Sequence, residues 1–260
     1  MQISDYLDDI ARSTGFLSRL PMPARHFEGH DGSLVRASGM FPVAGLLIAL
    51  CPGLVLAVLS AFDANAALTA VLALGVLIGL TGALHEDGLA DSADAFGARG
   101  GREHMLEIMK DSRTGTYGVL ALVMSFALRA IALTIILSVI GGWSSFLVLL
   151  AIAAASRAAM VWHWNALPPA RQGGVAAAVG APDQSARTQA LLAGGLLFLA
   201  FAALTAGPVP ALLSLAILAA AASLWTSIVG TKLEGHTGDT IGATQQISET
   251  VCLTALALLL

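Results

Sequence analysis

The densest group of reactive side chains lies between residues 85 and 117. Three aspartates, Asp87, Asp91 and Asp94, recur at spacings of four and three residues, which places them on one stripe of a helix. Carboxylates held this close repel one another, and a hard divalent cation with oxygen ligands relieves the repulsion. The alternative is a solvated acidic helix start, which the helix dipole favours. The neighbouring apolar segment favours the metal site, because carboxylates near lipid are costly unless they bind a cation or a partner.

Further reactive groups flank this acidic stripe. His85 and Glu86 precede it, and each is a candidate general base or a group that orients a ligand. Lys110, Asp111 and Arg113 follow a glycine-rich turn. Asp111 is a candidate fourth metal ligand, and the two cations suit phosphate oxygens. The competing interpretation of this segment is a helix C-terminus with basic residues and a glycine stop.

A second polar segment precedes the last apolar run of the chain. His236, Thr237 and Asp239 stand among glycines between residues 232 and 244, where backbone N–H groups and a helix N-terminus can hold an anion. Asp239 is also an ordinary candidate for a helix cap. Arg171 adds a cation from the loop that follows the fourth apolar run. These residues are therefore candidates for substrate binding.

Three charged residues fall inside apolar runs. Arg129, Arg157 and Glu249 are each placed more than a helical turn from the nearest loop. Such residues face the interior of a helical bundle or a wet cavity, because lipid does not solvate charge. The sequence leaves two pairings open for the arginines, with Glu249 or with a substrate phosphate.

The elements that must position these groups are membrane helices. The chain is 57% hydrophobic and 12% charged, which excludes an ordinary soluble domain. Several uncharged runs reach the ~20 residues that a helix needs to span a bilayer. We expect an all-α, polytopic integral membrane bundle, with residues 1–37 as a cytoplasmic or interfacial segment and 38–260 as the transmembrane catalytic domain. The predicted helices are about 39–60, 66–84, 117–140, 143–167, 190–206, 209–230 and 241–260.

The distribution of Lys and Arg predicts the orientation. The N-terminal segment and the loops 85–116, 168–189 and 231–240 contain Lys or Arg, whereas the three short connectors contain neither. Positive charge in short loops marks the cytoplasmic side. The N-terminus and every polar motif are thus expected on the cytoplasmic face. One decorated face suits an enzyme, whereas a transporter needs polar groups near the midplane and access from both sides.

The motifs also resemble a known family. The runs Leu84–Asp94, Glu107–Gly118 and Thr237–Ala243, with Phe16–Pro23 and Phe41–Gly45, are similar to cobalamin synthase, also called adenosylcobinamide-GDP ribazoletransferase. The resemblance extends over about residues 15–250. It implies a Mg²⁺-dependent integral membrane enzyme of late cobamide (vitamin B12) biosynthesis. Such an enzyme joins adenosylcobinamide-GDP to α-ribazole, or to its 5′-phosphate, and releases GMP.

The resemblance gives the candidate residues provisional roles. Metal binding is expected from four carboxylates. Phosphate or substrate binding is expected from a second set of residues, which includes Arg157 and Glu249 of the apolar runs. Glu86, His85 and Asp87 form the catalytic set. The metal ligands are Asp87, Asp91, Asp94 and Asp111, and the substrate-binding residues are Lys110, Arg113, Arg171, His236, Thr237, Asp239, Arg157 and Glu249.

The resemblance also implies partners and a location. The expected partners are the small-molecule substrates and membrane lipid, with no nucleic acid, and a homo-oligomer is left open. The expected location is the bacterial cytoplasmic (inner) membrane, as a multi-pass protein with its active site on the cytoplasmic face.

Two other functions compete with this one. CDP-alcohol phosphotransferases use a related acidic motif, but Asp91 stands here where that pattern has arginine, and its later pair of spaced aspartates is missing. A cation transporter could use the acidic stripe as an ion site, although the bare outer connectors disfavour it. A purely structural scaffold is least favoured, since it gains nothing from repelling acids.

Overall fold

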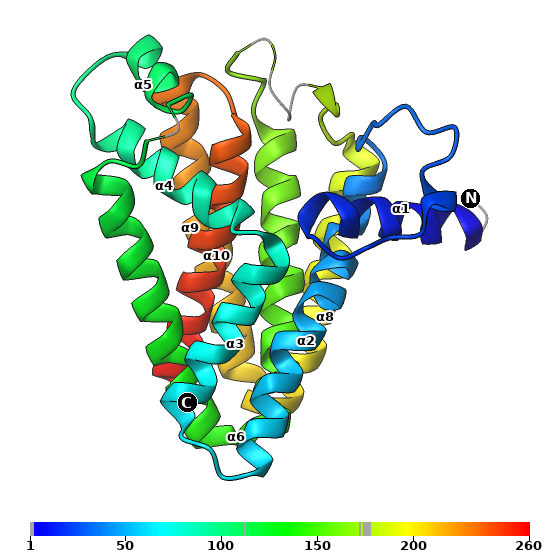
Figure 1. Cartoon of the computed structure of the whole chain (residues 1–260), viewed down its shortest axis with the longest axis vertical. Helices are drawn as coiled ribbons and strands as arrows, with labels where there is room; N and C mark the ends of the chain where they lie inside the picture. Colours follow the sequence, from blue (N-terminus) through cyan, green and yellow to red (C-terminus); the bar gives the residue numbers. More distant parts are fainter. Residues whose placement is uncertain (1–2, 112, 172, 174–177) are drawn as a thin grey trace.

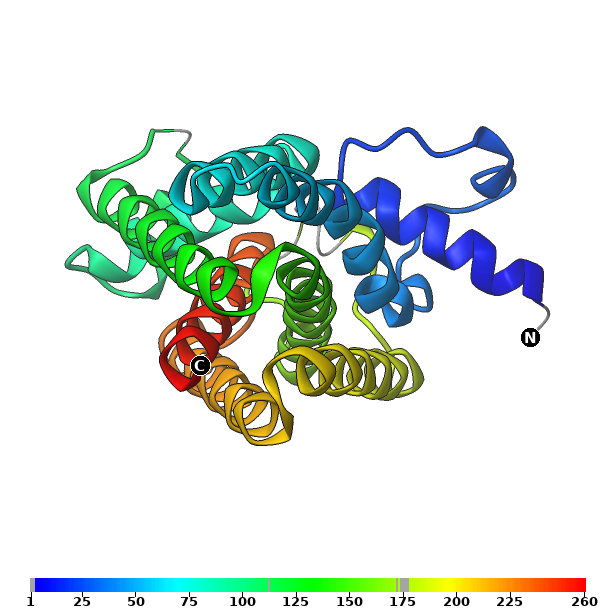
Figure 2. The ribbon, with the colours of Figure 1, turned by 90° about the horizontal axis from the view of Figure 1, so that it is seen from below.

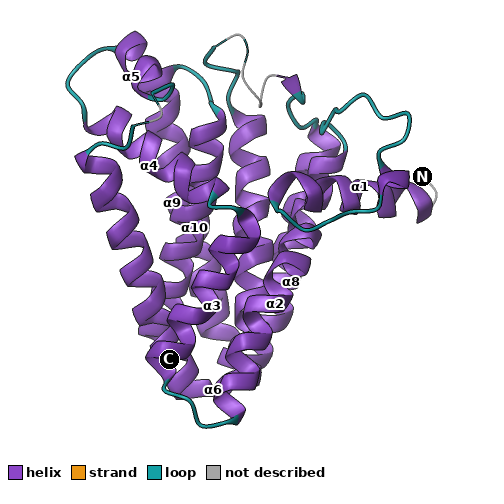
Figure 3. Cartoon of the chain, viewed as in Figure 1, coloured by secondary structure: helices purple, strands orange, loops and turns teal. Residues whose placement is uncertain are grey.

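The computed structural model describes residues 3–111, 113–171, 173 and 178–260. Within these residues the chain forms helices and no strand, apart from one isolated bridge between Pro169 and His236 (Figure 3). Ser112 of the second motif lies outside the described residues. The predicted all-α class is confirmed.

The long helices pack side by side in one bundle (Figures 1 and 2). Gly141 divides α6 into two limbs, because its φ of 78° and ψ of 172° are not helical. This break lies where the sequence predicted a turn between two helices. The long helices are α2 (Phe41–Ala61), α3 (Ala66–Thr81), α6 (Thr116–Ala166), α8 (Gln184–Ala206), α9 (Pro208–Leu233) and α10 (Gly238–Leu259).

Length and composition identify fewer membrane spans than the seven that were predicted. Among the described residues four helical segments are long and apolar enough, and α3 with its bent continuation would make five. The stretch 116–166 counts once in this tally although Gly141 divides it. The polytopic membrane class therefore stands, whereas the number seven stays a prediction.

Two helices lie crosswise near one end of the bundle, which we call the α4 end (Figure 1). They are α1 (Ile3–Leu17) and α4 (Leu84–Gly97). The chain bends by 89° between α3 and α4 at Gly82 and Ala83, which both have left-handed φ angles, 63° and 59°. α4 thus lies across the spanning helices and is not one of them. The predicted helix 66–84 is therefore too long at its C-terminal end, because α3 ends at Thr81.

Small side chains let the spanning helices approach closely. A Cβ on Gly194 of α8 would lie 2.5 Å from the Cβ of Ala158, and one on Gly45 of α2 would lie 2.5 Å from the carbonyl oxygen of Ala153. Both neighbours belong to the second limb of α6, which is consequently enclosed by other helices. Membrane helices are commonly held together in this way, since contact between small residues maximises van der Waals packing.

The two crosswise helices are tied to the bundle by specific contacts. Asp9 of α1 accepts two hydrogen bonds from the Arg36 guanidinium, at 2.8 and 3.0 Å. The backbone N–H of Arg19 donates to the carbonyl of Leu80 at 2.7 Å, and Leu17 is fully buried. The end of α1 is therefore fixed beside the bend between α3 and α4.

Candidate active site

Carboxylates from two distant segments meet where α4 crosses the start of α10. Gly88 makes the crossing close, since a Cβ there would lie 2.7 Å from the carbonyl oxygen of Asp239 and 3.2 Å from the Cα of Gly242. Asp87 and Asp91 lie one residue before and three after Gly88 on α4. We call Asp87, Asp91 and Asp239 the acid cluster.

The electrostatics of Asp91 reflect this crowding. Burial, together with the charges of Asp87 and Asp239, raises the pKa of Asp91 to about 6. Asp94 contributes a smaller effect of the same sign. Like charges in a partly buried place disfavour ionisation unless a cation joins them. The acid cluster therefore has the electrostatic character of a cation site.

Asp239 was expected to bind substrate or to cap a helix; the structure places it beside the α4 acids and gives the cap to another residue, and its substrate-binding role stays a prediction. The cap of α10 is Thr237, whose hydroxyl accepts from the N–H of Thr240 at 3.2 Å while Thr240 bonds back to the N–H of Thr237. Thr237 also donates to Asp239 at 3.3 Å. Arg171 is the cation facing Asp239, at 3.9 Å. No local pattern of residues indicated that the 237–240 turn reaches α4.

His236 lies immediately before this turn. Burial lowers the pKa of His236 to about 4, so its ring is neutral at pH 7. Neither ring nitrogen has a hydrogen-bond partner within the described residues. A buried polar group without a partner is costly, and it marks a place where a ligand or a water is expected to bind. The predicted substrate-binding role of His236 is compatible with this environment.

Asp94 has a different environment from the acid cluster. Its two carboxylate oxygens accept the backbone N–H groups of Gly115 at 2.6 Å and Gly118 at 2.9 Å. These N–H groups lie at the start of α6, where the backbone N–H groups of a helix have no carbonyl partner within the helix. Asp94 thus fastens α4 to the start of α6.

Asp111 and its two cations are further out. Arg113 donates to Asp111 through Nη2 at 2.6 Å and Nε at 3.0 Å, and this contact lowers the pKa of Asp111. The charges that act on Asp91 do not include Asp111. Lys110 and Arg113 are both exposed. Their predicted roles therefore remain predictions, and the described structure does not bring Asp111 to the acid cluster.

A ready-made metal cage is not present among the described residues, because no three His, Cys, Asp or Glu side chains there are arranged to hold an ion. The acid cluster nevertheless offers the right donor atoms. Carboxylate oxygens from two elements suit Mg²⁺, which binds through one or two carboxylates and keeps several waters or phosphate oxygens. The residues fit such an ion as an open site that substrate phosphate completes.

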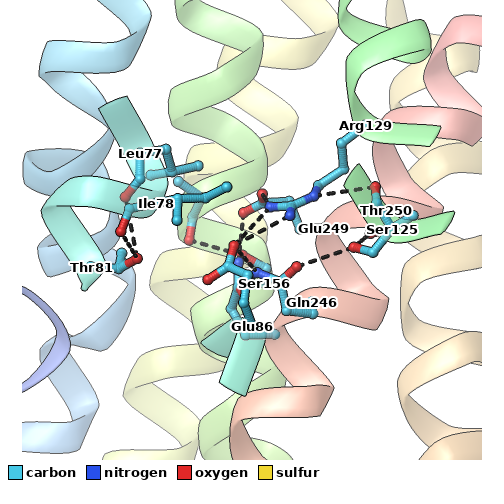
Figure 4. Close-up of polar contacts among 12 residues, drawn as sticks. Leu77, Ile78, Thr81, Glu86, Ser125, Arg129, Ser156, Gln246, Glu249 and Thr250 are labelled. Carbon is cyan, nitrogen blue, oxygen red and sulfur yellow. Dashed lines mark hydrogen bonds and ion pairs between the residues drawn. The ribbon is translucent and has the colours of Figure 1, made fainter. Parts of the chain in front are cut away.

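Beneath the acid cluster, the bundle contains a buried network of charges (Figure 4). Arg129 donates to Glu86 at 3.2 Å and to Glu249 at 3.1 Å, and Arg157 donates to the other oxygen of Glu249 at 3.2 Å. Gln246 adds a hydrogen bond to Glu86 at 3.0 Å. The Arg129, Arg157 and Glu249 side chains are about 1% exposed.

This network resolves one of the open pairings. Of the two alternatives for the arginines, the structure has the ion pair with Glu249. A buried charge pair is more stable when its other donors and acceptors are also bonded. Gln245 and Gln246 each donate to one of the two glutamates, whereas Arg157 Nε and Glu86 Oε2 have no partner among the described residues. Since Glu86 belongs to α4, the network also ties α4 to α6 and α10. The substrate-binding roles predicted for Arg157 and Glu249 are not tested by this arrangement.

Two neighbouring cavities open beside the acid cluster. The inner one, of about 280 Å³, is lined by Asp87, Asp239 and His85, together with apolar side chains of α1, α6 and α10. The outer one, of about 450 Å³, is lined by Asp87 and by Arg19. Asp87 thus stands where the two cavities meet.

Arg19 was not among the predicted site residues. Within the described residues its guanidinium makes no ion pair, although it packs against Gly82. The available signal was its place in the Phe16–Pro23 motif. His85 was predicted, and its Nε2 has no hydrogen-bond partner among the described residues.

The fold and the site together define a class of protein. The chain is a helical membrane protein that gathers carboxylates, cations and a small cavity at one end of its bundle. Such an arrangement suits reactions of phosphate esters, in which cations bind the phosphates and positioned carboxylates hold a metal.

The chain belongs to the cobalamin-5-phosphate synthase family, whose model matches residues 9–257. An adenosylcobinamide-GDP ribazoletransferase of Sinorhizobium medicae is 52% identical over 99% of this chain and 98% of the relative. Proteins of the same name from Rhizobium meliloti and Brucella anthropi are 51% and 40% identical, over 98% and 100% of both chains. No solved structure matches the chain.

Proposed function

We propose that this protein is an adenosylcobinamide-GDP ribazoletransferase that acts in the last step of cobamide synthesis. Its relatives carry that name over nearly their whole length. The observation that carries the proposal is the acid cluster, where carboxylates of α4 and α10 meet beside Arg171 and Arg19. This arrangement favours a phosphoryl-transfer enzyme over a cation transporter, since the charges in the bundle interior are already paired with one another.

The reaction is a displacement at phosphorus. A ribose hydroxyl oxygen of α-ribazole, or of its 5′-phosphate, attacks the phosphorus that is attached to the cobinamide side arm. A new P–O bond forms, and the P–O bond of the diphosphate to GMP breaks. The hydroxyl proton passes to a base, and GMP leaves with the bridging oxygen.

The acid cluster of Asp87, Asp91 and Asp239 would hold Mg²⁺ through one or two of its carboxylates, with waters or phosphate oxygens as the other ligands. When bound, Mg²⁺ supplies charge neutralisation on the phosphoryl oxygens. Arg171 and Arg19 are cations that suit the phosphate groups of the two substrates, because a guanidinium group can bind two phosphate oxygens at once. Asp94 and Asp111 remain predicted ligands, and in this structure each already has hydrogen-bond donors of its own.

The cavity lining favours His85 over Glu86 as the proton acceptor. His85 Nε2 and Glu86 Oε2 both lack a partner among the described residues, but His85 lines the inner cavity, whereas Glu86 is not among its lining residues and its Oε1 receives Arg129 and Gln246. A base must reach the proton that it removes, and a carboxylate committed to an arginine is a poor acceptor. Glu86 would instead hold α4 in place.

The proposed location is the bacterial inner membrane, with the α4 end of the bundle in the cytoplasm. Lys110, Arg113 and Arg171 all belong to loops at this end, and positively charged loops remain on the cytoplasmic side. The nucleotide-linked substrates are expected in the cytoplasm, so this orientation gives them access to the acid cluster.

The test is GMP release by the purified protein in detergent or liposomes. The donor is adenosylcobinamide-GDP and the acceptor α-ribazole 5′-phosphate, with and without Mg²⁺. We expect release that requires both acceptor and Mg²⁺ and that falls at least a hundredfold in an Asp87→Asn variant. Asp63→Asn is the matched control, since Asp63 is an exposed acid in the connector at the opposite end. A well-folded protein that releases no GMP would refute the proposal.

A further inference from the structure

The inner cavity has an unusual lining for a site that handles phosphates. Its apolar walls come from three helices, with Phe16 of α1, Met160 and Trp164 of α6, and Ile241 of α10. Its volume of about 280 Å³ is at the small end of the range of ligand sites. Such a cavity accommodates one compact ring system and excludes a whole nucleotide or a corrin ring.

Trp164 is the wall residue with an unfulfilled polar group. Its side chain is 1% exposed, and its indole N–H has no acceptor within the described residues. Phe41 and His236 pack on the ring, with centroids 6.3 Å away in both cases, and hold it in place. A buried donor of this kind is normally hydrogen-bonded. A ligand that combines an aromatic face with a ring-nitrogen acceptor would satisfy both features.

Both substrates of the proposed reaction contain a heteroaromatic base. Guanine exposes several donors and acceptors, and its N1–H and amino group need acceptors facing them. The benzimidazole base of ribazole is mainly apolar and has one ring-nitrogen acceptor. The apolar wall residues and the indole donor match the benzimidazole, because its ring gains from apolar contacts and its ring nitrogen can accept from the indole N–H. In this arrangement Asp87, Asp239 and His85, which also line the cavity, face the ribose.

The position of the cavity agrees with this choice. Asp87 and Asp239 line the same cavity, so a base seated against Trp164 has its ribose beside the acid cluster. Asp87 also lines the outer cavity that contains Arg19, which suits a 5′-phosphate. The attacking ribose hydroxyl and the phosphate of the acceptor would then lie on opposite sides of Asp87.

We propose that the cavity between Phe16 and Trp164 is the subsite for the aromatic base of the ribazole acceptor. This inference rests on the proposed function and specifies which substrate enters from the side of α1. The indole N–H of Trp164 donates to the ring nitrogen of the base, and Phe16 forms part of the wall around its ring.

Direct binding tests the subsite without catalysis. Purified protein in nanodiscs is titrated calorimetrically with α-ribazole and, separately, with GDP, in the absence of the donor substrate. We expect Trp164→Ala to weaken α-ribazole binding at least tenfold and to leave GDP binding within twofold. In turnover, the KM for α-ribazole rises while the KM for adenosylcobinamide-GDP is unchanged. Trp164→Phe should produce an intermediate loss, since it retains a ring and removes the donor.

Trp162→Ala is the matched control, because Trp162 is two residues away on α6 and lines a different cavity, against α8 and α9. If Trp164→Ala fails to fold, Phe16→Ala replaces it, since Phe16 is only half-buried at the rim of the cavity. Weakened GDP binding with normal α-ribazole binding would assign the cavity to guanine and overturn the proposal. Unchanged binding of both would also overturn it. Neither result affects GMP release by the unaltered protein, which tests the proposed function separately.

Discussion

Asp94 illustrates how one residue can belong to an acidic motif and still differ from its neighbours. Both of its oxygens bind backbone N–H groups at the start of α6. We expect Asp94→Asn to lower the free energy of unfolding by about 1.5–3 kcal/mol, because an amide has one acceptor oxygen where the carboxylate has two. Thermal unfolding in detergent measures this change.

A comparison with Asp91→Asn separates structure from metal binding. Among the described residues Asp91 accepts no such backbone N–H groups, and its replacement removes a like charge from the acid cluster. We expect Asp91→Asn to retain the stability of the unaltered protein and to weaken Mg²⁺ binding. Equal loss of stability in the two variants would contradict the separate roles.

Glu249 is the central acid of the buried network. It receives hydrogen bonds from Arg129, Arg157 and Gln245. Glu249→Gln should destabilise the protein by about 3–5 kcal/mol, because it leaves the two buried guanidinium groups of the network with Glu86 as their one carboxylate partner. Thermal melts in detergent test this expectation.

A second replacement serves as the control for Glu249. Adding Arg157→Met should recover part of the loss, since it removes the one buried positive charge in excess, while Arg129 keeps its pair with Glu86. If the double variant melts lower than the single variant, the network does not have the pairing described here.

At this scale the sequence predicted some partnerships and not others. The pairing of Arg129 and Arg157 with Glu249 was an open alternative, because a membrane interior forces charges to find one another. The position of Asp239 beside α4 was not predicted, since its distance from α4 is set by a crossing of two helices. Contacts between such remote segments leave no local pattern to detect.

Among the secondary-structure elements, the close crossing of α4 and α10 depends on Gly88. A Cβ at this residue would lie 2.7 Å from the carbonyl oxygen of Asp239. The contact is with backbone, which moves away only if the helices shift. We expect Gly88→Ala to separate the two helices and lower GMP release at least tenfold, because a displacement of about 1 Å in a catalytic group can cost a hundredfold in rate.

Gly79→Ala is the control for this prediction. Gly79 lies on α3, and nothing stands within 4 Å of a Cβ there. Alanine is the better helix former, so this variant should keep full activity and gain slight stability. Gly88→Ala with the activity of Gly79→Ala would show that the crossing tolerates separation.

The bend between α3 and α4 shows where element prediction fails. The apolar run continued to residue 84, so a helix 66–84 was the natural expectation. The chain turns instead at Gly82 and at Ala83, an alanine with a φ of 59°. Glycine adopts this conformation freely but alanine does so rarely, so only the packing of α4 on α6 and α10 accounts for it. By contrast, the break in α6 at Gly141 was predicted from a Gly-Gly turn.

The helical membrane architecture of the whole molecule could be predicted mainly from composition. Long apolar runs require helices in a bilayer, since every backbone polar group must be paired within its own segment. α10 is the exception to simple hydropathy. It contains Glu249 and two glutamines, yet it is the most enclosed helix, because its polar side chains complete the buried network. Counting spans by apolarity alone therefore misses it.

At the level of the whole molecule, we expect the α4 end of the bundle to face the cytoplasm, and cysteine labelling tests this orientation. The cysteines Cys51 and Cys252 are first replaced by serine, and single cysteines are introduced by Glu103→Cys at the α4 end and by Asp63→Cys in the connector at the other. Both sites are exposed. With the α4 end cytoplasmic, an impermeant maleimide should label the Asp63→Cys variant in intact spheroplasts and the Glu103→Cys variant only in inverted vesicles. The reverse pattern would put the acid cluster outside and remove its access to cytoplasmic nucleotides.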